Sequence, residues 1–437
     1  MNILVATASF NNGITARDAG ECIIRGAKRI YPKDDYTLFP LADGGRGTVE
    51  AIITMQGGEY VECDTFDPLG RPIRARYGIL ADGAAVIEAA SASALDLLPG
   101  DERNPLGTSS YGTGIMMMDA IRKGVRNIYL ALGDSDIPDG GWGMAKALGI
   151  RFLDSDGRML SDGAESLVSL ERIDPSFMST TVKNASFRLL TDMQIPLTGE
   201  NGAERVYSTD DTGDTLSRAL SRYREILMRD WAFDPDSISG SGAAGGMTCP
   251  LLAFTSATKT LKATDYILFL SDFAGRVNDA DLVITGEDRL GRWTAESSLP
   301  YAVIKRAQSH RQYKDIVVIG NTLEEGYEKL YGVNVEVVVT ALERRGEQSR
   351  EDSMNAIMNT SESVFRIIRM AMSLKTEKGK KSKGILRRKN KKGREWTPGM
   401  KERQAKPKRP LYSPKEHVPA SSDHEPRKRG RPRKTSS

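Results

Sequence analysis

Residues 38–45 read Leu-Phe-Pro-Leu-Ala-Asp-Gly-Gly, and residues 129–141 repeat the form, with an apolar run leading to a second Asp-Gly-Gly. Each glycine pair lies between an expected strand and an expected helix. Glycine lets the backbone approach a ligand closely, and free N–H groups at a helix start attract anions. Asp-Gly is also ordinary turn chemistry, and because such turns are common a simple turn is the favoured explanation of either copy alone. Phosphate binding and plain turns are therefore both open.

The alternation of short apolar runs with helix-period stretches, from residue 1 to about 374, predicts an α/β fold with parallel sheet. Residues 60–88 differ, because alternating strands there are separated by turn signals, which predict antiparallel strands and a second domain. Expected parallel strands lie near 3–6, 36–40, 128–132, 188–191, 282–285, 316–319 and 335–339. Expected helices lie near 16–30, 47–55, 112–123, 140–148, 216–230, 294–308 and 350–373.

Cysteine usage and hydropathy exclude several classes of protein. Cys22, Cys63 and Cys249 are far apart, so neither a disulfide framework nor a thiolate metal site is indicated. No run approaches the ~18 consecutive apolar residues of a membrane-spanning helix. The first residues lack the features of a signal peptide and read as a strand. We expect a cytoplasmic protein without a membrane partner.

Charge divides the chain unevenly. Residues 375–437 carry about 23 Lys and Arg against about 6 acids, so the stated net charge of +4 combines a basic tail with an acidic body. Too few large apolar residues remain in the tail to offset the entropy of ordering it. We expect the tail to be disordered and, through its charge, to favour nucleic acid.

The sharpest motif of the tail resembles an AT-hook centred on Gly-Arg-Pro. Its glycine and proline hold the backbone extended, so that neighbouring arginines fit a narrow A·T-rich minor groove. A solvated basic tail, or a nuclear-localisation-like run, is the alternative. The expected DNA-binding residues are Arg427, Lys428, Arg429, Gly430, Arg431, Pro432, Arg433 and Lys434.

Two further stretches of the body could hold a ligand. Glu287 lies at the mouth of an expected buried strand, where ligands of open α/β sheets gather. The glycine-rich stretch 239–246 precedes an apolar helical pattern. It could cradle phosphate or only allow close helix packing. Its spacing matches neither a Walker loop nor a dinucleotide fingerprint.

Further blocks of the body stand in a fixed order: Pro40-Leu-Ala-Asp-Gly-Gly45, Asp67-Pro-Leu-Gly-Arg-Pro72, Glu102-Arg-Asn-Pro-Leu106, Tyr111-Gly-Thr-Gly114, Asp139-Gly-Gly-Trp-Gly-Met144, Pro196-Leu-Thr-Gly199, Gly242-Ala-Ala-Gly-Gly246 and Asp281-Leu-Val-Ile-Thr-Gly-Glu287. Together these blocks resemble type I glycerate kinases, in family order from residue 1 to about 370, so coincidence does not explain them. The resemblance implies a Rossmann-like parallel-sheet domain made of discontinuous segments, about 1–60 and 280–374. A second α/β domain spans about 61–279, and the disordered tail follows.

The resemblance also implies ATP- and Mg²⁺-dependent phosphorylation of D-glycerate, or of a similar small hydroxy acid, between the two domains. Two carboxylates would orient or deprotonate the hydroxyl, two would bind Mg²⁺, and the turns would bind substrate or phosphate. The implied catalytic residues are Asp43 and Asp192, the substrate- or phosphate-binding residues Gly44, Gly45, Ser135, Gly140 and Gly141, and the Mg²⁺ ligands Asp139 and Glu287.

Several polar positions of the family are replaced. Its opening strand usually ends in Asp-Ser-Phe-Lys, where this chain has Ala8-Ser9-Phe10-Asn11. Arg46 stands where Glu commonly follows the first Asp-Gly-Gly, which reverses the charge. Charge-stabilising groups carry phosphoryl transfer, so these changes favour a weakened or lost activity. Further replacements stand at Pro138, Gln194, Ile195, Gly291, Trp293, Ser297 and Ser298.

Two functions are therefore open. In the first, the chain is a glycerate kinase with an accessory tail. In the second, a catalytically degenerate kinase fold senses a small ligand or acts as a scaffold, while the tail binds A·T-rich DNA and makes the protein DNA-associated. The surviving acids support the first function, and the replaced positions support the second.

Overall fold

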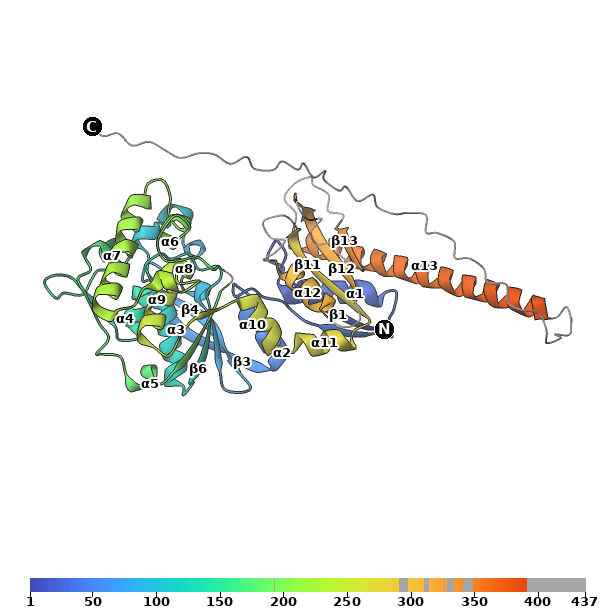
Figure 1. Cartoon of the computed structure of the whole chain (residues 1–437), viewed down its shortest axis with the longest axis horizontal. Helices are drawn as coiled ribbons and strands as arrows, with labels where there is room; N and C mark the ends of the chain where they lie inside the picture. Colours follow the sequence, from blue (N-terminus) through green and yellow to red (C-terminus); the bar gives the residue numbers. More distant parts are fainter. Residues whose placement is uncertain are drawn as a thin grey trace, which may run out of the picture. The chain divides into compact units, whose positions relative to one another are not determined.

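The computed structural model of the chain (Figure 1) describes residues 1–191, 193–290, 298–309, 314–325, 327, 334–340 and 349–390, with 375–390 as backbone only. The chain divides into two compact units, Met1–Lys375 and Thr376–Ser437. The first unit holds both large sheets.

A five-stranded parallel sheet has the order β13-β12-β11-β1-β2, so its strands come from both ends of the first unit. The register pairs Thr7 with Gly286 and Glu287 with Gly320, which brings the carboxyl ends of β1, β11 and β12 to one edge. The strands are β1 (Asn2–Thr7), β2 (Asp35–Leu38), β11 (Leu282–Leu290), β12 (Asp315–Leu323) and β13 (Val335–Val339).

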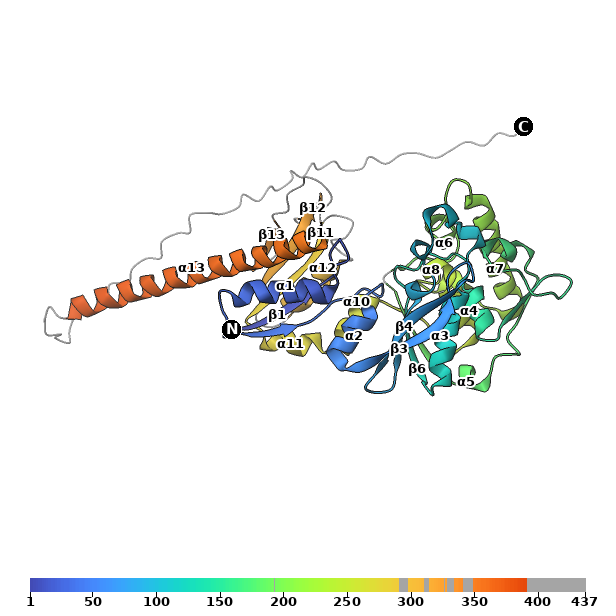
Figure 2. The ribbon, with the colours of Figure 1, turned by 180° about the vertical axis from the view of Figure 1, so that it is seen from behind.

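Helices cover both faces of this sheet, because its strands are apolar on both sides. Leu4 and Ala6 face α11 and α12, whereas Ile3 and Val5 face α1 and α13. Figure 2 shows α1 and α13 on the face turned toward the viewer. The helices are α1 (Ala16–Lys28), α11 (Phe273–Asp279), α12 (Leu299–Gln308) and α13 (Arg350–Asn390).

The second sheet has six strands in the order β10-β9-β6-β5-β4-β3. Strand β4 pairs antiparallel with β3 and β5, which confirms the antiparallel strands expected between residues 60 and 88, while the other pairs are parallel. The strands are β3 (Gly58–Phe66), β4 (Pro72–Leu80), β5 (Ala85–Glu88), β6 (Asn127–Ala131), β9 (Ser186–Leu190) and β10 (Thr260–Leu261), beside a separate antiparallel pair, β7 (Arg151–Leu153) and β8 (Arg172–Asp174).

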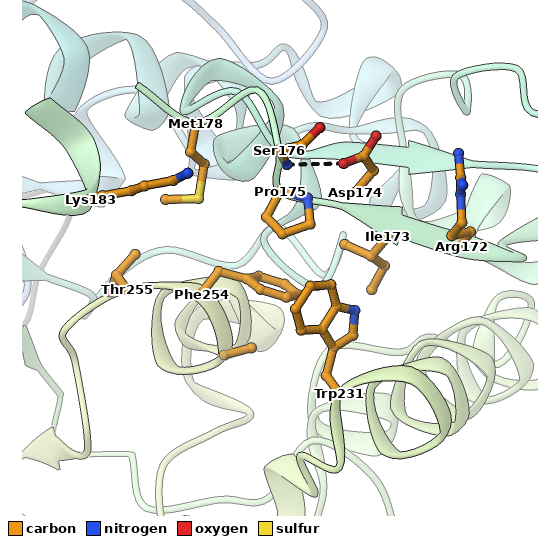
Figure 3. Close-up of a pocket in the computed structure, with 11 residues that line it drawn as sticks. Arg172, Ile173, Asp174, Pro175, Ser176, Met178, Lys183, Trp231, Phe254 and Thr255 are labelled. Atoms are coloured by element: carbon orange, nitrogen blue, oxygen red, sulfur yellow. Dashed lines mark hydrogen bonds between the residues drawn. The ribbon is translucent and has the colours of Figure 1, made fainter. Parts of the chain in front are cut away.

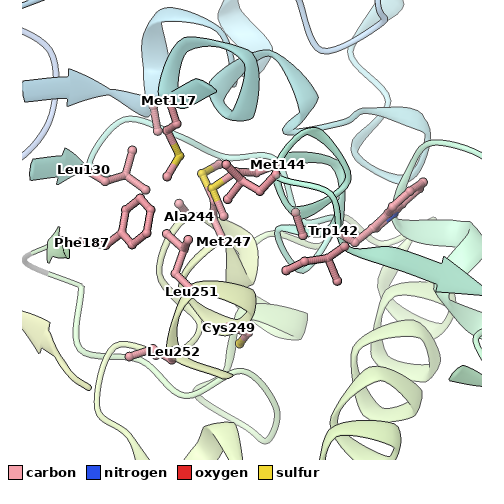
Figure 4. Close-up of a cluster of buried hydrophobic side chains, with 14 of the residues drawn as sticks. Met117, Leu130, Trp142, Met144, Phe187, Ala244, Met247, Cys249, Leu251 and Leu252 are labelled. Carbon is pink, nitrogen blue, oxygen red and sulfur yellow. The ribbon is translucent and has the colours of Figure 1, made fainter. Parts of the chain in front are cut away.

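The largest hydrophobic core lies on one face of the six-stranded sheet. Figure 4 shows part of it, with Met117, Leu130 and Met144 meeting Phe187 and Met247. On the opposite face, α2 and α10 bury their own smaller cluster. The helices around this sheet are α2 (Thr48–Gln56), α3 (Tyr111–Arg122), α4 (Trp142–Ala147), α5 (Thr180–Lys183), α6 (Ala203–Val206), α7 (Gly213–Trp231), α8 (Ala243–Gly246), α9 (Thr248–Phe254) and α10 (Ala263–Leu270).

Local chemistry sets the ends of the helices. Thr15 and Asp18 form a capping box at the start of α1, satisfying N–H groups that the helix leaves free. Helix α12 begins at Leu299, where Ser298 accepts from the Tyr301 N–H and Pro300 occupies the first turn. The start expected near 294 falls outside the described residues.

Helix α13 continues to Asn390, so residues 375–390 are helical where the sequence predicts that a disordered tail begins. Lys and Arg, which recur among residues 375–390, are good helix formers and so favour this helix. The AT-hook-like residues 427–434 lie outside the described residues. Among the helices that are described, none has the length and hydropathy to cross a bilayer.

Candidate functional site

A cleft of about 570 Å³ opens at the carboxyl ends of β1, β2 and β11. Ligands of open α/β sheets bind at this edge, because loops there are free to carry polar groups. The cleft is lined by Ala8, Ser9, Phe10, Asn11, Gly13, Ile14, Thr15, Ala16, Leu41, Ala42, Asp43, Arg46, Gly47, Asp134, Glu287, Asp288, Arg289 and Leu299. Of the predicted site residues, Asp43 and Glu287 are brought together here.

Asp43 is the first residue of the first Asp-Gly-Gly, in the loop that follows β2. The Gly45 N–H donates to its Oδ1 at 3.0 Å, which fixes the turn. Solvent reaches the carboxyl through the cleft, but protein surrounds its other sides. Burial raises the pKa of Asp43 above its ordinary value, and the charge of Asp134 adds to the effect. A carboxylate with a raised pKa is a stronger base.

Glu287 lies in β11 with its Oε1 buried and without a hydrogen-bond partner in the described part of the chain. Burial, together with the nearby charge of Asp43, raises the pKa of the carboxyl to about 8, although a hydrogen bond from Ser298 acts in the opposite direction. A buried polar atom without a partner is costly. The cleft therefore holds an uncompensated acceptor that a cation or a proton would satisfy.

The loop after β6 closes onto the first turn. The Gly133 N–H donates to the Gly44 carbonyl at 2.8 Å, and the Arg46 N–H donates to Asp134 Oδ2 at 2.8 Å. A Cβ on Gly133 would lie 2.6 Å from the Gly45 nitrogen, so only glycine allows this approach. The two loops are thus joined through their main chains.

The second Asp-Gly-Gly has a different position. Asp139 is fully buried, and its carboxylate accepts hydrogen bonds from the Ser110 N–H and hydroxyl and from the N–H groups of Gly141 and Gly143. Burial nevertheless raises the pKa of Asp139 to about 6. The residue does not line the cleft, and its oxygens already have donors. This is the bonding of a carboxylate that holds the fold, and it does not bring Asp139 beside Glu287 as a metal ligand.

The glycines of this second turn serve close packing. Gly140 donates to the Gly245 carbonyl at 2.9 Å, and a Cβ on Gly141 would lie 2.6 Å from the Met247 Cα. The glycine-rich stretch 239–246 is therefore packed against Gly140 and Gly141, which favours the packing alternative over a phosphate cradle. Ser135 is also buried, donating to the Ser93 carbonyl at 2.5 Å, outside the cleft.

A polar network at the cleft was missed by the sequence reasoning. The Asn11 side chain and N–H donate to Asp288, which also accepts from Asn321 Nδ2 at 2.6 Å. Thr340 donates in turn to Asn321 Oδ1 at 2.6 Å. The four residues follow or end β1, β11, β12 and β13. Their common position at strand ends was the signal available in the sequence.

The residues fit a magnesium ion only in part. Among the described residues, no group of three or more His, Cys, Asp or Glu side chains is placed to hold a metal. Magnesium is commonly held by one or two carboxylates together with substrate phosphates and water. Glu287, with its unpartnered oxygen, fits that arrangement. Asp192 and residues 291–297 lie outside the described residues.

A second hollow, of about 580 Å³, shares no residue with the cleft. Figure 3 shows Trp231 and Phe254 facing Ile173 and Pro175 across it, and the two rings meet edge to face with centroids 4.9 Å apart. Its carboxylate, Asp174, is paired with Arg151. It therefore offers aromatic surface but no free carboxylate for proton transfer.

Comparison with known proteins decides the family. Residues 3–369 match the model of the glycerate kinase family. This chain belongs to the glycerate kinase family.

Several members of the glycerate kinase family resemble the chain over most of their length. It is 36% identical to a glycerate kinase of Halalkalibacterium halodurans over 78% of this chain and 91% of that protein. It is 38% identical to a Bacillus subtilis glycerate kinase over 73% and 84% of the two chains. The crystal structure of a candidate glycerate kinase 2 from Salmonella typhimurium LT2 matches with a TM-score of 0.73 at 31% identity, covering 86% of this chain and all of that one. The α/β fold implied by the resemblance is thereby confirmed.

For a glycerate kinase family member, the replaced residues have definite places. Asn11, where the resemblance predicts Lys, binds Asp288 at the cleft edge. Arg46, where the resemblance predicts Glu, lines the cleft and forms a bidentate pair with Asp96. Both replacing side chains therefore form polar interactions with neighbouring carboxylates.

Proposed function

We propose that the chain transfers the γ-phosphoryl group of ATP to a hydroxyl of D-glycerate, at the cleft lined by Asp43 and Glu287. The observation that carries the proposal is the pair itself: two carboxylates with raised pKa values at the carboxyl edge of a parallel sheet, one with an unpartnered buried oxygen. Such perturbed groups in a cleft are typical of functional sites, because a purely structural carboxylate is normally bonded.

Asp43 is the group proposed to orient and deprotonate the hydroxyl. The hydroxyl oxygen forms a bond to the γ-phosphorus, the bond from that phosphorus to the bridging oxygen breaks, and the proton passes to the Asp43 carboxylate. The raised pKa makes the carboxylate a better base for this step. Its bond from the Gly45 N–H keeps the carboxyl in one orientation. Asp192 stays a candidate for the same role.

Glu287 is the residue proposed to hold Mg²⁺ together with the phosphates of the nucleotide. The ion, when bound, neutralises charge on the phosphates during transfer. Ser298 donates a hydrogen bond that steadies the carboxyl. Gly44 and Gly45 do not themselves line the cleft, but they join two residues that do, Asp43 and Arg46, and the phosphates would lie beside this turn. The absence of the family's Lys at Asn11 makes us expect a rate below that of an ordinary kinase.

The test is ATP turnover by the full chain with D-glycerate and Mg²⁺, beside Asp43→Asn. We expect turnover that needs both substrates and falls about 10²- to 10³-fold in the variant, the usual cost of removing a catalytic group. Asp174→Asn is the matched control, since it removes a carboxylate from the second hollow, which shares no lining residue with the cleft. Turnover that Asp43→Asn leaves unchanged would reject the assignment. No turnover at all would favour the degenerate fold that senses a ligand or acts as a scaffold.

We also propose that residues 427–434 bind A·T-rich DNA. The motif Arg427-Lys-Arg-Gly-Arg-Pro-Arg-Lys434 and the basic residues before it support the proposal. Fluorescence anisotropy with A·T-rich and G·C-rich duplexes tests it. Arg429→Ala with Arg431→Ala should remove the preference for A·T, whereas Lys415→Ala should only weaken binding slightly. Equal affinity for both duplexes would reject the minor-groove interpretation.

A further inference from the structure

The charge of the cleft poses a problem for an anionic substrate. Asp43, Asp134 and Asp288 line it beside Glu287, whose pKa of about 8 keeps that carboxyl protonated near neutral pH until a cation binds. Among the described lining residues, the cations are Arg46 and Arg289. A small acid entering such a site is repelled unless a cation meets its charge. One of these two arginines is therefore the cation that can meet the charge of the acid.

Arg46 has the position and the bonding for this task. Its N–H is fixed by Asp134, and it follows Asp43 and the two glycines in the same turn. The guanidinium forms a bidentate pair with Asp96, in which Nη1 and Nη2 each donate to a carboxylate oxygen at 2.5 Å. The side chains of Arg46 and Asp96 are 43% and 53% exposed. An ion pair this exposed contributes little stability, so another carboxylate can replace Asp96 at small cost.

Arg289 is placed differently. It lies beyond Asp288 on β11, is 65% exposed, and binds Glu324, whose side chain is 28% exposed. Its partner is thus less open to exchange than Asp96. Arg289 is also separated along the chain from Asp43, whereas Arg46 shares its turn. Of the two cations, Arg46 is the one whose guanidinium can turn from a solvent-exposed partner to a ligand in the cleft.

We propose that Arg46 binds the carboxylate of D-glycerate, exchanging Asp96 for the substrate. The inference rests on the proposed function and deepens it. A planar guanidinium matches a carboxylate through two parallel hydrogen bonds, a geometry that lysine cannot reproduce. Because glycerate has only three carbons, a carboxylate held at Arg46 keeps the hydroxyl groups inside the cleft that Asp43 lines. Arg46 would then select a hydroxy acid over the corresponding uncharged alcohol.

Calorimetric titration of the full chain with D-glycerate provides the test. We expect Arg46→Ala to weaken D-glycerate binding at least 10-fold, the scale of a lost charged hydrogen bond. Arg46→Lys should recover only part of the loss. Asp96→Asn should tighten binding a few-fold, because a competitor for the guanidinium is removed. Arg289→Ala is the matched control, and we expect it to change the affinity less than 3-fold.

A parallel titration with a non-hydrolysable ATP analogue and Mg²⁺ separates carboxylate from phosphate binding. We expect Arg46→Ala to leave this affinity within 3-fold. A loss confined to the nucleotide would overturn the inference and make Arg46 a phosphate ligand, as would unchanged D-glycerate binding in a variant with the wild-type melting temperature. If the wild-type chain binds no D-glycerate, the proposed function fails and the inference with it. If the wild-type chain binds it and Arg46→Ala binds it equally, only the inference fails.

Discussion

The two Asp-Gly-Gly turns share a sequence but not a role. Asp43 faces an open cleft with one main-chain donor on its Oδ1. Asp139 is fully buried and accepts four hydrogen bonds. The difference comes from what each turn meets: the first meets a loop that leaves its carboxyl free, and the second meets Ser110 and a tightly packed glycine stretch. A carboxylate's partners, and not its motif, decide whether it is available for chemistry.

The largest expected effect is a loss of stability at the buried turn. In Asp139→Asn, one oxygen becomes an NH₂ group that must face N–H or O–H donors, so at least one buried donor loses its acceptor. We expect a loss of about 2–4 kcal/mol in unfolding free energy, measured by denaturant titration near pH 7. Asp43→Asn should change it by less than about 0.5 kcal/mol, because the carboxyl is open to solvent through the cleft and has one main-chain donor, the Gly45 N–H. Equal losses in the two variants would contradict the comparison.

The glycines should sharpen the same contrast. A methyl group at Gly141 would meet the Met247 backbone at 2.6 Å, at a positive φ of 72°. We expect Gly141→Ala to cost about 2–3 kcal/mol, because backbone cannot move aside. At Gly45 the nearest atom is the end of the Asp134 side chain, which can rotate. Gly45→Ala should therefore cost about 1 kcal/mol or less while weakening substrate binding. The reverse order of stabilities would show that the first turn, and not the second, holds the fold.

The smallest expected effect is a pH dependence at the cleft. The pKa of Glu287 is raised from 4.5 to about 8, so the folded chain holds a proton that the unfolded chain releases between these values. Stability from this group is complete below about pH 4.5 and is lost as pH rises through 8. Between pH 5.5 and 8.5, the free energy of unfolding of the wild type should fall by about 1–2 kcal/mol more than that of Glu287→Gln, after discounting for partial exposure. The difference is measured as a larger decrease in the melting temperature of the wild type. Identical dependence of melting temperature on pH in the wild type and in Glu287→Gln would contradict the raised pKa of Glu287.

Much of the fold was predictable from the sequence, because it rests on periodic patterns. The strands near residues 3–6, 282–285, 316–319 and 335–339 were expected and are present. So was the position of Glu287 at the mouth of β11, since ligand-binding groups of such sheets follow strand ends. These features are set by local pattern, and a reader of the sequence has all the information needed.

The remaining features depend on contacts between distant residues. Asp139 has its Ser110 donors 29 positions away, so nothing beside it in sequence distinguishes it from Asp43. Likewise Asn11 and Asp288, 277 positions apart, meet only when β1 and β11 pair. The ion pair between Arg46 and Asp96 likewise joins residues that are distant in the sequence. Such tertiary partners could not be predicted from the local pattern of the sequence.

The hydrogen bond from Gly133 to Gly44 also has a kinetic meaning. It joins a loop after β6 of one sheet to a loop after β2 of the other, at the rim of the cleft. Any separation of the two loops must break it, and the amide proton then becomes free to exchange with water. The exchange rate of the Gly133 amide proton therefore reports how often the two loops separate. Measured by NMR with and without ligand, it also shows how far a bound ligand suppresses this opening.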